Sequence, residues 1–540
     1  MRRVRRAAAL TQEELAERAQ LTDRGIRYLE RDLRRPNRDT VERLARALGL
    51  SAQDKAAFTA AARPQQPEAT RRAGELRMPP HPLVGREHDV NSVRAQLIDH
   101  QARLLTLTGP GGVGKTSLAL VAAAGLRAAF PGGLTWVPLA SLPDAALLPA
   151  AAAHALGLGE TGASPAVEAI RSALDERPTL MVLDNLEHLE AAPFLSDLLA
   201  TCPQLTLLAT SRSPLGIRAE QQFPVHPLPT PRDVPGLPVH AVAANPSVDL
   251  FLRRAQAVQP ALVLTEANAE AVAAICRRLD GLPLAIELAA ARISVLPPQA
   301  MLTRLDHRLS FLTGGAGDLP PRQRAMRTTM AWSYELLSEA HRAVFARLAL
   351  FDGSFGFAAL EVVLETDPMA LLDAVESLHR SNLLLLADAV DDEPRFRMLG
   401  IIRDFGLECL AHQGDAEEIR ERHAAYYLAL AEEAAGGLYG PEAIHWLDLL
   451  EEDHANLRAA LRRFLDRQDA VKGVRLCAAL WAFWYVRGYA TEGRAHMSAF
   501  LALPMPASAQ AVRARAGSAP VVAGVGRARK AASWSRPSVA

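Results

Sequence analysis

The residues best suited to chemistry lie in one glycine-rich stretch that directly follows the apolar run Leu104–Thr108. Its glycines allow a tight turn in which backbone N–H groups point inward and bind phosphate oxygens. The Lys115 ammonium can reach the β- and γ-phosphates of a nucleotide, and the Thr116 hydroxyl can hold Mg²⁺. The stretch matches G-x-x-x-x-G-K-[ST] in full, and its predicted phosphate-binding residues are Gly109, Gly111, Gly112, Val113, Gly114, Lys115, Thr116 and Ser117.

Two later segments end in charged residues that can act on the same phosphates. The apolar run Thr179–Asp184 places a carboxylate at the carboxyl edge of a parallel sheet, where Asp184 can hold Mg²⁺ directly or through water. The run Leu205–Arg212 ends in an arginine that can reach a γ-phosphate. Each of the two residues has an alternative interpretation: Asp184 as a structural carboxylate, and Arg212 as a surface arginine. Lys115, Asp184 and Arg212 are the candidate catalytic residues.

The elements that position these residues follow from hydrophobic patterning. Short apolar runs indicate strands at 104–108, 134–139, 179–184 and 205–212, and the Ala/Leu-rich stretch 116–130 continues from the loop as a helix. Strands that alternate with helices predict a parallel α/β sheet. The loop and Asp184 are therefore expected to lie together at one edge of that sheet.

Residues 1–50 have a composition that suits an anionic partner. They contain thirteen arginines and no lysine against eight acidic residues, a net charge of +5, whereas the whole chain has 60 basic and 60 acidic residues. Thr11–Glu14 forms a capping box that starts one helix, and a second helix with Arg24, Arg27 and Arg31 on its outer face follows after a short turn. This pattern is typical of a helix-turn-helix, whose second helix lies in the major groove of DNA.

The segment resembles the Cro/repressor type of helix-turn-helix, from Leu10–Ala16 through Ile26–Arg31 to Pro36. The resemblance implies that one residue of the first helix contacts phosphate and that residues of the second helix face the bases. A helical module that binds protein rather than DNA is the alternative. The expected DNA-contacting residues are Gln12, Thr22, Asp23, Arg24, Arg27 and Arg31.

The central part of the chain resembles the NB-ARC branch of the STAND signalling ATPases. The loop and the two charged strand ends are followed, in the order of that family, by Cys276–Ala289, which contains Gly-Leu-Pro-Leu. The resemblance covers roughly residues 83–500 and implies that ATP or ADP binds together with Mg²⁺, which Thr116 and Asp184 would hold. It also implies cofactor-binding residues outside the loop: Val84 and Arg86 in the adenine pocket, and Pro283 of a helical lid against ADP.

Two further regions extend this resemblance. The unit that starts near Leu319 resembles the winged-helix domain of these ATPases, although the histidine that many members direct at the ADP β-phosphate is absent from Met398–Gly400. Arg403 is a candidate replacement or a solvent-facing helix residue. From about residue 410 the chain is Ala/Leu-rich, and 456–461 and 478–485 resemble the first helices of a tetratricopeptide array.

The expected fold class is a multidomain α and α/β protein: an all-α helix-turn-helix head, a P-loop parallel α/β ATPase core, a helical lid, a winged helix and the start of an α-helical repeat. Residues 507–540 lack periodicity, which predicts a disordered or frameshifted tail. The expected boundaries are 1–63 for the head, 64–82 for a linker, 83–240 for the core, 241–318 for the lid, 319–408 for the winged helix, 409–506 for the repeat-like helices and 507–540 for the tail.

The function implied by the resemblance is a DNA-binding transcription regulator switched by ADP and ATP. A signal or protein partner would act at the C-terminal helices, and a nucleotide-dependent homo-oligomer is expected. Hydrolysis should be slow, because Asn185 rather than a second carboxylate follows Asp184, and Glu187 is a poor candidate base. The alternatives are a P-loop kinase and a signalling or defence scaffold whose helix-turn-helix binds protein.

The sequence also gives an expectation for the compartment. It contains no apolar run of transmembrane length, and its arginine-rich start lacks the apolar segment of a signal peptide. The four cysteines are scattered, without the spacing of a metal site or a disulfide framework. A cytoplasmic protein with no membrane partner is therefore expected.

Overall fold

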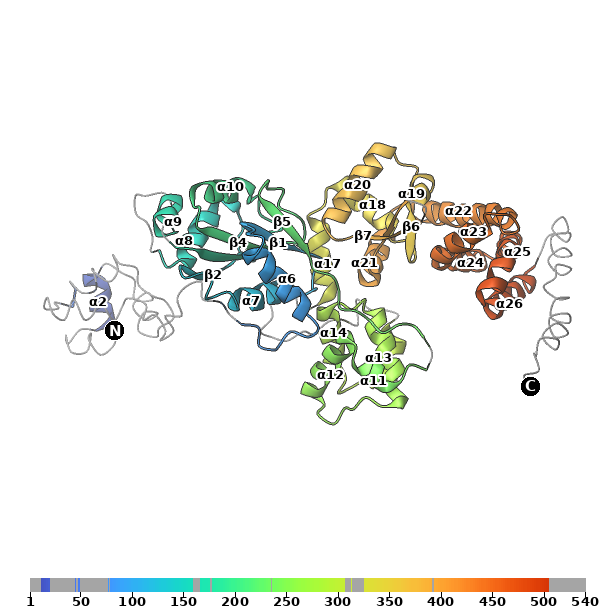
Figure 1. Ribbon diagram of the computed structural model, residues 1–540, viewed down its shortest axis with the longest axis horizontal. Coiled ribbons are helices and arrows are strands. Elements are labelled where there is room, and N and C mark those ends of the chain that lie inside the picture. The colour runs from blue at the N-terminus through green and yellow to red at the C-terminus, as the bar shows by residue number, and fades with distance from the viewer. Residues whose placement is uncertain are drawn as a thin grey trace. The chain divides into compact units, whose positions relative to one another are not determined.

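The computed structural model of the protein (Figure 1) describes residues 11–19, 44, 47–48, 76, 78–158, 166–174, 177–234, 236–305, 312, 325–390 and 393–504. The chain divides into two compact units, Met1–Glu75 and Leu76–Ala540, and each is described by itself. The division falls inside the segment 64–82, whose composition predicts a linker.

In the first unit, helix α2 (Gln12–Arg18) starts at the predicted capping box. The Thr11 N–H donates to Glu14 Oε2 at 2.7 Å, and the Glu14 N–H donates to Thr11 Oγ1 at 3.1 Å. The hydrogen bond from the Thr11 backbone, followed by one from the Thr11 side chain, lowers the pKa of the Glu14 carboxyl. The predicted first helix is therefore confirmed, whereas the second helix with Thr22, Asp23, Arg24, Arg27 and Arg31 lies outside the described residues.

A five-stranded parallel sheet forms the core of the second unit. Its strand order is β2-β3-β4-β1-β5, so the strand that leads into the phosphate loop lies between two neighbours. Four of the strands were predicted by their apolar runs. The strands are β1 (Leu104–Thr108), β2 (Gly133–Pro138), β3 (Thr179–Asp184), β4 (Leu205–Thr210) and β5 (Glu220–Pro224).

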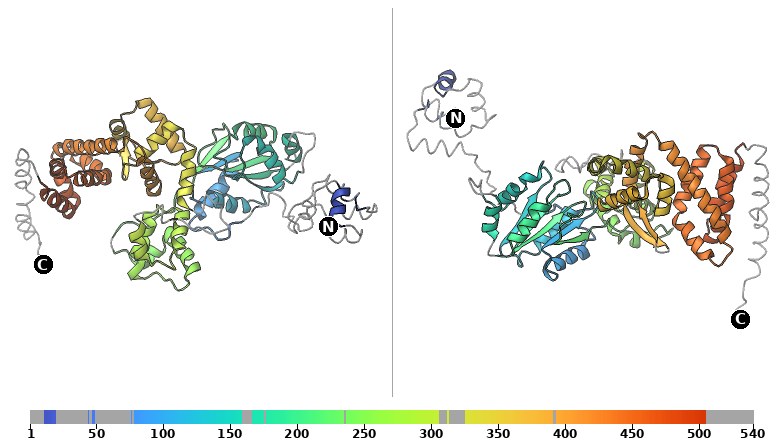
Figure 2. Two further views of the ribbon diagram at one scale, coloured as in Figure 1. Left: turned by 180° about the vertical axis from the view of Figure 1, so that it is seen from behind. Right: turned by 90° about the horizontal axis from the view of Figure 1, so that it is seen from above.

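Helices cover both faces of this sheet (Figure 2). Alternate side chains of β1 point to opposite faces: Leu105 and Leu107 pack with one set of helices, and Leu104 packs with the other. The first set is α6 (Glu87–Ile98) and α7 (Lys115–Ala124); the second is α8 (Leu148–Ala155), α9 (Ala166–Leu174) and α10 (Ala192–Thr201). The predicted α/β fold class is thus present, although α7 ends at Ala124, before Gly125, rather than at residue 130.

A group of helices follows the core. The segment before α14 contains Asp280 (φ 54°) and Gly281 (φ 65°), and a Cβ at Gly281 would lie 1.9 Å from the Leu228 carbonyl oxygen, so only glycine fits there. Pro283 is the first residue of α14, the helix position that proline favours. The helices are α11 (Val239–Ala243), α12 (Pro246–Val258), α13 (Glu266–Arg278), α14 (Pro283–Ala290) and α15 (Pro298–Arg304).

The next group is a winged helix preceded by one further helix, α17 (Met326–Glu335). Three antiparallel strands in the order β6-β8-β7 pack beside three helices, and a fourth helix follows the last strand. These elements are α18 (Glu339–Leu348), β6 (Ser354–Gly356), α19 (Phe357–Leu364), α20 (Pro368–Arg380), β7 (Leu385–Val390), β8 (Glu393–Arg397) and α21 (Gly400–Leu410).

Antiparallel helices make up the remainder of the described chain. Among the neighbouring aromatic residues of α25, Phe483 and Trp484 are fully buried in the core between helices, whereas Tyr485 is exposed. None of the helices that the structure describes is long and apolar enough to cross a membrane. The helices are α22 (Ala416–Gly437), α23 (Ala443–Glu452), α24 (His454–Asp466), α25 (Ala470–Arg487) and α26 (Ala490–Leu501).

Candidate nucleotide-binding site

The glycine-rich loop joins β1 to α7 and requires its glycines for two reasons. Gly109, Gly112 and Gly114 have φ values of 147°, 82° and 99°, which disfavour residues with a side chain. Neighbouring segments also come close: a Cβ on Gly111 would lie 2.7 Å from Thr329 Cγ2 of α17. Backbone N–H groups of a glycine-rich loop and the positive dipole end of a helix such as α7 favour a bound phosphate.

Lys115 and Thr116 are the first two residues of α7. Lys115 Nζ donates to the carbonyl oxygens of Gly109 at 2.7 Å and Pro110 at 3.1 Å, so the ammonium is folded back over the loop. Burial lowers the pKa of Lys115 to about 8. A bound phosphate would offer this partly desolvated cation a stronger acceptor than two carbonyls.

Thr116 and Asp184 meet, as the metal-site prediction requires. Thr116 Oγ1 and Thr210 Oγ1 each donate to Asp184 Oδ1 at 2.7 Å. Burial raises the pKa of Asp184, and the two hydroxyl hydrogen bonds counteract that rise. A hydroxyl beside a carboxylate at the mouth of a phosphate loop is a donor set that suits Mg²⁺, which would also favour the ionised carboxylate.

The low pKa of Lys115 leads to a pH prediction. Below pH 8 the lysine is charged in the free protein, and phosphate binding should favour the charged form further. Above pH 8 the free protein loses this proton, so nucleotide binding must restore it and the affinity for ADP should fall by up to about tenfold per pH unit. Isothermal titration between pH 7 and 9.5 checks this, and an affinity that stays constant across that range would contradict it.

Arg212 is buried rather than a surface residue, with 6% of its area exposed. Its Nε donates to Glu187 Oε1 at 3.1 Å and its Nη1 donates to the Thr329 carbonyl at 3.1 Å. The guanidinium lies 4.5 Å from the ring centroid of Trp332. The predicted γ-phosphate arginine is therefore in direct contact with α17.

Arg86 donates hydrogen bonds to the backbone of the loop and of a neighbouring segment. Its Nη2 donates to the carbonyl oxygens of Val113 at 3.2 Å and His226 at 2.6 Å, and its Nη1 pairs with Asp89 at 2.8 Å. Val84 is also buried. Because the Arg86 guanidinium is committed to backbone carbonyls, its shown role is to hold the loop in place, and the predicted adenine contact stays a prediction.

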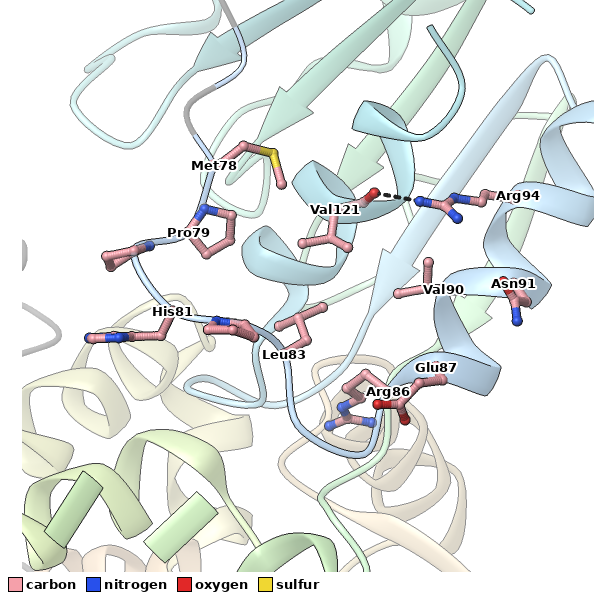
Figure 3. A pocket seen from close by; sticks show the side chains of 12 residues that line it. Met78, Pro79, His81, Leu83, Arg86, Glu87, Val90, Asn91, Arg94 and Val121 are labelled. Carbon is pink, nitrogen blue, oxygen red and sulfur yellow. Dashed lines mark hydrogen bonds between the residues drawn. The ribbon is translucent and has the colours of Figure 1, made fainter. Parts of the chain in front are cut away.

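A cavity of about 620 Å³ lies beside Arg86 (Figure 3). Arg94, on its wall, donates to the Val121 carbonyl at 3.0 Å. The lining of the cavity includes Leu83, Arg86 and Glu87 of the predicted adenine segment but no residue of the phosphate loop. The lining residues are Met78, Pro79, Pro80, His81, Pro82, Leu83, Arg86, Glu87, Val90, Asn91, Arg94 and Val121.

The lid and the winged helix both touch the site. The Leu284 N–H, directly after Pro283, donates to the Gly112 carbonyl at 3.1 Å, which ties α14 to the loop. At the other end of the same turn, Asp280 Oδ2 accepts from the Ile401 N–H of α21 at 3.2 Å. Leu399 occupies the middle position of Met398–Gly400, where the resemblance leads us to expect a histidine. Its side chain is buried and apolar.

Arg403 does not replace that histidine in this arrangement. Its Nε donates to the Phe351 carbonyl at 2.7 Å, and its Nη1 lies 3.6 Å from Asp352 Oδ1. Both partners belong to the winged helix itself. Arg403 therefore stabilises its own domain.

Sequence reasoning missed the partners of Arg212. None of the motifs described in the sequence contains Thr329, Trp332 or Asn382. Asn382, at the end of α20 with φ 55°, donates its Nδ2–H to the Arg212 carbonyl at 2.5 Å. These contacts join residues more than a hundred positions apart, which periodicity cannot detect.

Comparison with known proteins agrees with this architecture. A helix-turn-helix family model matches residues 1–55, and a winged helix-turn-helix domain model matches residues 337–411. Rv0890c of Mycobacterium tuberculosis (strain ATCC 25618 / H37Rv), whose name describes an HTH-type transcriptional regulator, is 36% identical over 427 residues, which are 77% of this chain and 46% of that protein. The chain thus spans less than half the length of this relative.

A second relative is matched over most of its length. Rv0894 of the same organism, an uncharacterized protein, is 34% identical over 348 residues, which are 63% of this chain and 84% of that protein. The crystal structure of the STAND protein PH0952 from Pyrococcus horikoshii, which has a tetratricopeptide repeat sensor, matches with a TM-score of 0.26 and 14% identity. The match covers 77% of this chain and 58% of that chain. The chain belongs to the family of Rv0894.

Proposed function

We propose that this protein is a DNA-binding transcription regulator that is switched by the exchange of ADP for Mg-ATP. The observation that carries the proposal is the buried cluster at the phosphate loop, where Lys115, Thr116, Asp184 and Arg212 converge with contacts from both the lid and α17. Such a cluster couples the nucleotide to the position of neighbouring domains, which a switch needs.

Each residue of the cluster has a distinct proposed role. Lys115 would leave the Gly109 and Pro110 carbonyls to bind the β- and γ-phosphates, while the loop N–H groups bind the β-phosphate. Thr116 and Asp184 would hold Mg²⁺, which neutralises phosphate charge when bound. Arg212 would contact the γ-phosphate, and Pro283, Val84 and Arg86 would border the nucleoside.

The DNA contact is assigned to the N-terminal head and not to the winged helix. Residues 337–411 contain 13 acidic residues against six arginines and no lysine, a net charge of −7, whereas residues 1–50 carry +5. In α20, the third helix of that domain, Arg380 is paired with Glu376 and Asp373 is exposed. A surface of this charge would repel DNA phosphates. Gln12, Thr22, Asp23, Arg24, Arg27 and Arg31 are the proposed DNA contacts.

ATP hydrolysis should be slow, because the nearest candidate base is poorly placed to accept a proton. The Glu187 side chain is 5% exposed, and its Oε1 already accepts a hydrogen bond from Arg212 Nε. We expect turnover well below the ~1 s⁻¹ lower bound of typical enzymes. Phosphate release from purified protein with Mg-ATP measures it, and turnover at ~10 s⁻¹, the typical enzyme median, would instead support an ordinary ATPase.

The proposal extends to partners and compartment. The helices α22–α26 would receive a signal or a protein partner, and the ATP-bound form would assemble into a homo-oligomer. A regulator of this kind would act in the cytoplasm, where its operator lies. Isothermal titration of ADP and of a non-hydrolysable ATP analogue, with and without Mg²⁺, tests the nucleotide part: saturable binding of both supports it, and binding of neither contradicts it.

A further inference from the structure

Two residues of α17 enclose the Arg212 guanidinium, which none of the predicted site roles explains. The Trp332 ring lies over the guanidinium at 4.5 Å, and the Thr329 carbonyl accepts from Nη1 at 3.1 Å. The His188 ring is 5.6 Å from the Trp332 ring between centroids. Trp332 therefore contacts both the arginine and the loop that follows β3.

The same guanidinium lies beside the phosphate loop. A Cβ on Gly111 would be 3.4 Å from Arg212 Cζ and 2.7 Å from Thr329 Cγ2, so α17, the arginine and the loop are in mutual contact. The charge of Arg212 also contributes, after burial, to lowering the pKa of Lys115. The arginine is thus close enough to affect the phosphate-binding lysine, while its hydrogen bonds are made to Glu187 and Thr329.

We propose that Thr329 and Trp332 are positioning residues that hold Arg212 away from the γ-phosphate, and that ATP must compete with them for the guanidinium. The inference rests on the proposed nucleotide switch. The Nη1 N–H that donates to the Thr329 carbonyl is not available to a phosphate oxygen, and the stacked Trp332 ring restrains the guanidinium plane. ADP has no γ-phosphate and leaves the contact intact, so α17 lowers the affinity for ATP relative to ADP.

Replacing the indole tests this competition. A Trp332→Ala variant should bind the non-hydrolysable analogue AMP-PNP with Mg²⁺ between about 3- and 30-fold more tightly, the range expected for a partly to fully desolvated cation–π contact, while its ADP affinity stays within about twofold. Trp332→Phe keeps an aromatic face and should restore most of the discrimination. The matched control is Arg327→Ala on the same helix, whose side chain is 60% exposed and pairs with Glu408.

A double variant separates positioning from a general loss of packing. If Trp332 acts through Arg212, then adding Trp332→Ala to an Arg212→Ala variant should leave the AMP-PNP-to-ADP affinity ratio unchanged. A purely structural effect of Trp332→Ala would weaken the binding of both nucleotides to the same degree, and that result would overturn the proposal. Weaker binding of AMP-PNP with unchanged binding of ADP would also overturn it. If the parent protein binds neither nucleotide, the proposed switch itself fails; if it binds both and Trp332→Ala keeps the parent ratio, only the positioning role fails.

Discussion

A Lys115→Met variant is expected to bind both ADP and Mg-ATP at least about 100-fold more weakly than the parent protein, because truncating one partner of a buried charged contact costs several kcal/mol. Methionine keeps the length and the apolar stem of the side chain but removes the ammonium that faces the loop carbonyls. Because the charge of Lys115 is already disfavoured by burial, the variant should fold at least as well as the parent.

The matched control is a second lysine outside the site. Lys472 of α25 pairs with Glu421 at 2.5 Å in the C-terminal helices, and Lys472→Met should leave both affinities unchanged. Fluorescence anisotropy of a labelled nucleotide measures each variant. Retention of parent affinity by Lys115→Met would show that the loop does not bind nucleotide.

The second large effect concerns DNA. Replacing Arg24, Arg27 and Arg31 with alanine is expected to weaken binding to an operator fragment by about 1,000-fold or more, since each specific arginine contact contributes ~1–3 kcal/mol. The slope of log affinity against log salt should become shallower, because fewer phosphate counterions are released.

An arginine of the winged helix provides the control for this experiment. Arg397 of β8 is exposed and belongs to the acidic domain, so Arg397→Ala should not change DNA binding. Electrophoretic mobility shifts at several salt concentrations compare the variants. Loss of binding in Arg397→Ala together with normal binding in the triple variant would assign DNA contact to the winged helix instead.

The phosphate side of the site was predictable because its residues obey local rules. The loop follows a buried strand, and Asp184 ends another, so the parallel sheet brings Thr116 and Asp184 together. β5 was missed because it is an edge strand with Glu220, Gln221 and Gln222 and therefore lacks an apolar run. Its pairing with β1 is a tertiary contact, and propensity does not report such contacts.

The interdomain contacts were not predictable for a related reason. Arg86 was expected to line the adenine pocket, but the sequence could not show that its guanidinium is used by the Val113 and His226 carbonyls. Arg212 was predicted to end a strand, but β4 ends at Thr210 and Arg212 lies two residues beyond it. Its enclosure by Thr329 and Trp332 depends on where α17 packs. Residue type and spacing thus predicted which groups could bind phosphate. The contacts that Arg86 and Arg212 make with distant segments are visible only in the folded structure.

The most direct test of a nucleotide-switched regulator is salt-dependent binding of the purified protein to genomic DNA fragments, including its own upstream region, with either ADP or a Mg-ATP analogue present. We expect selective retention of a few fragments, with an affinity that differs between the two nucleotides. Absence of retention in both states, with nucleotide binding intact, would contradict DNA binding and favour a signalling scaffold. Equal retention with both nucleotides would contradict the switch.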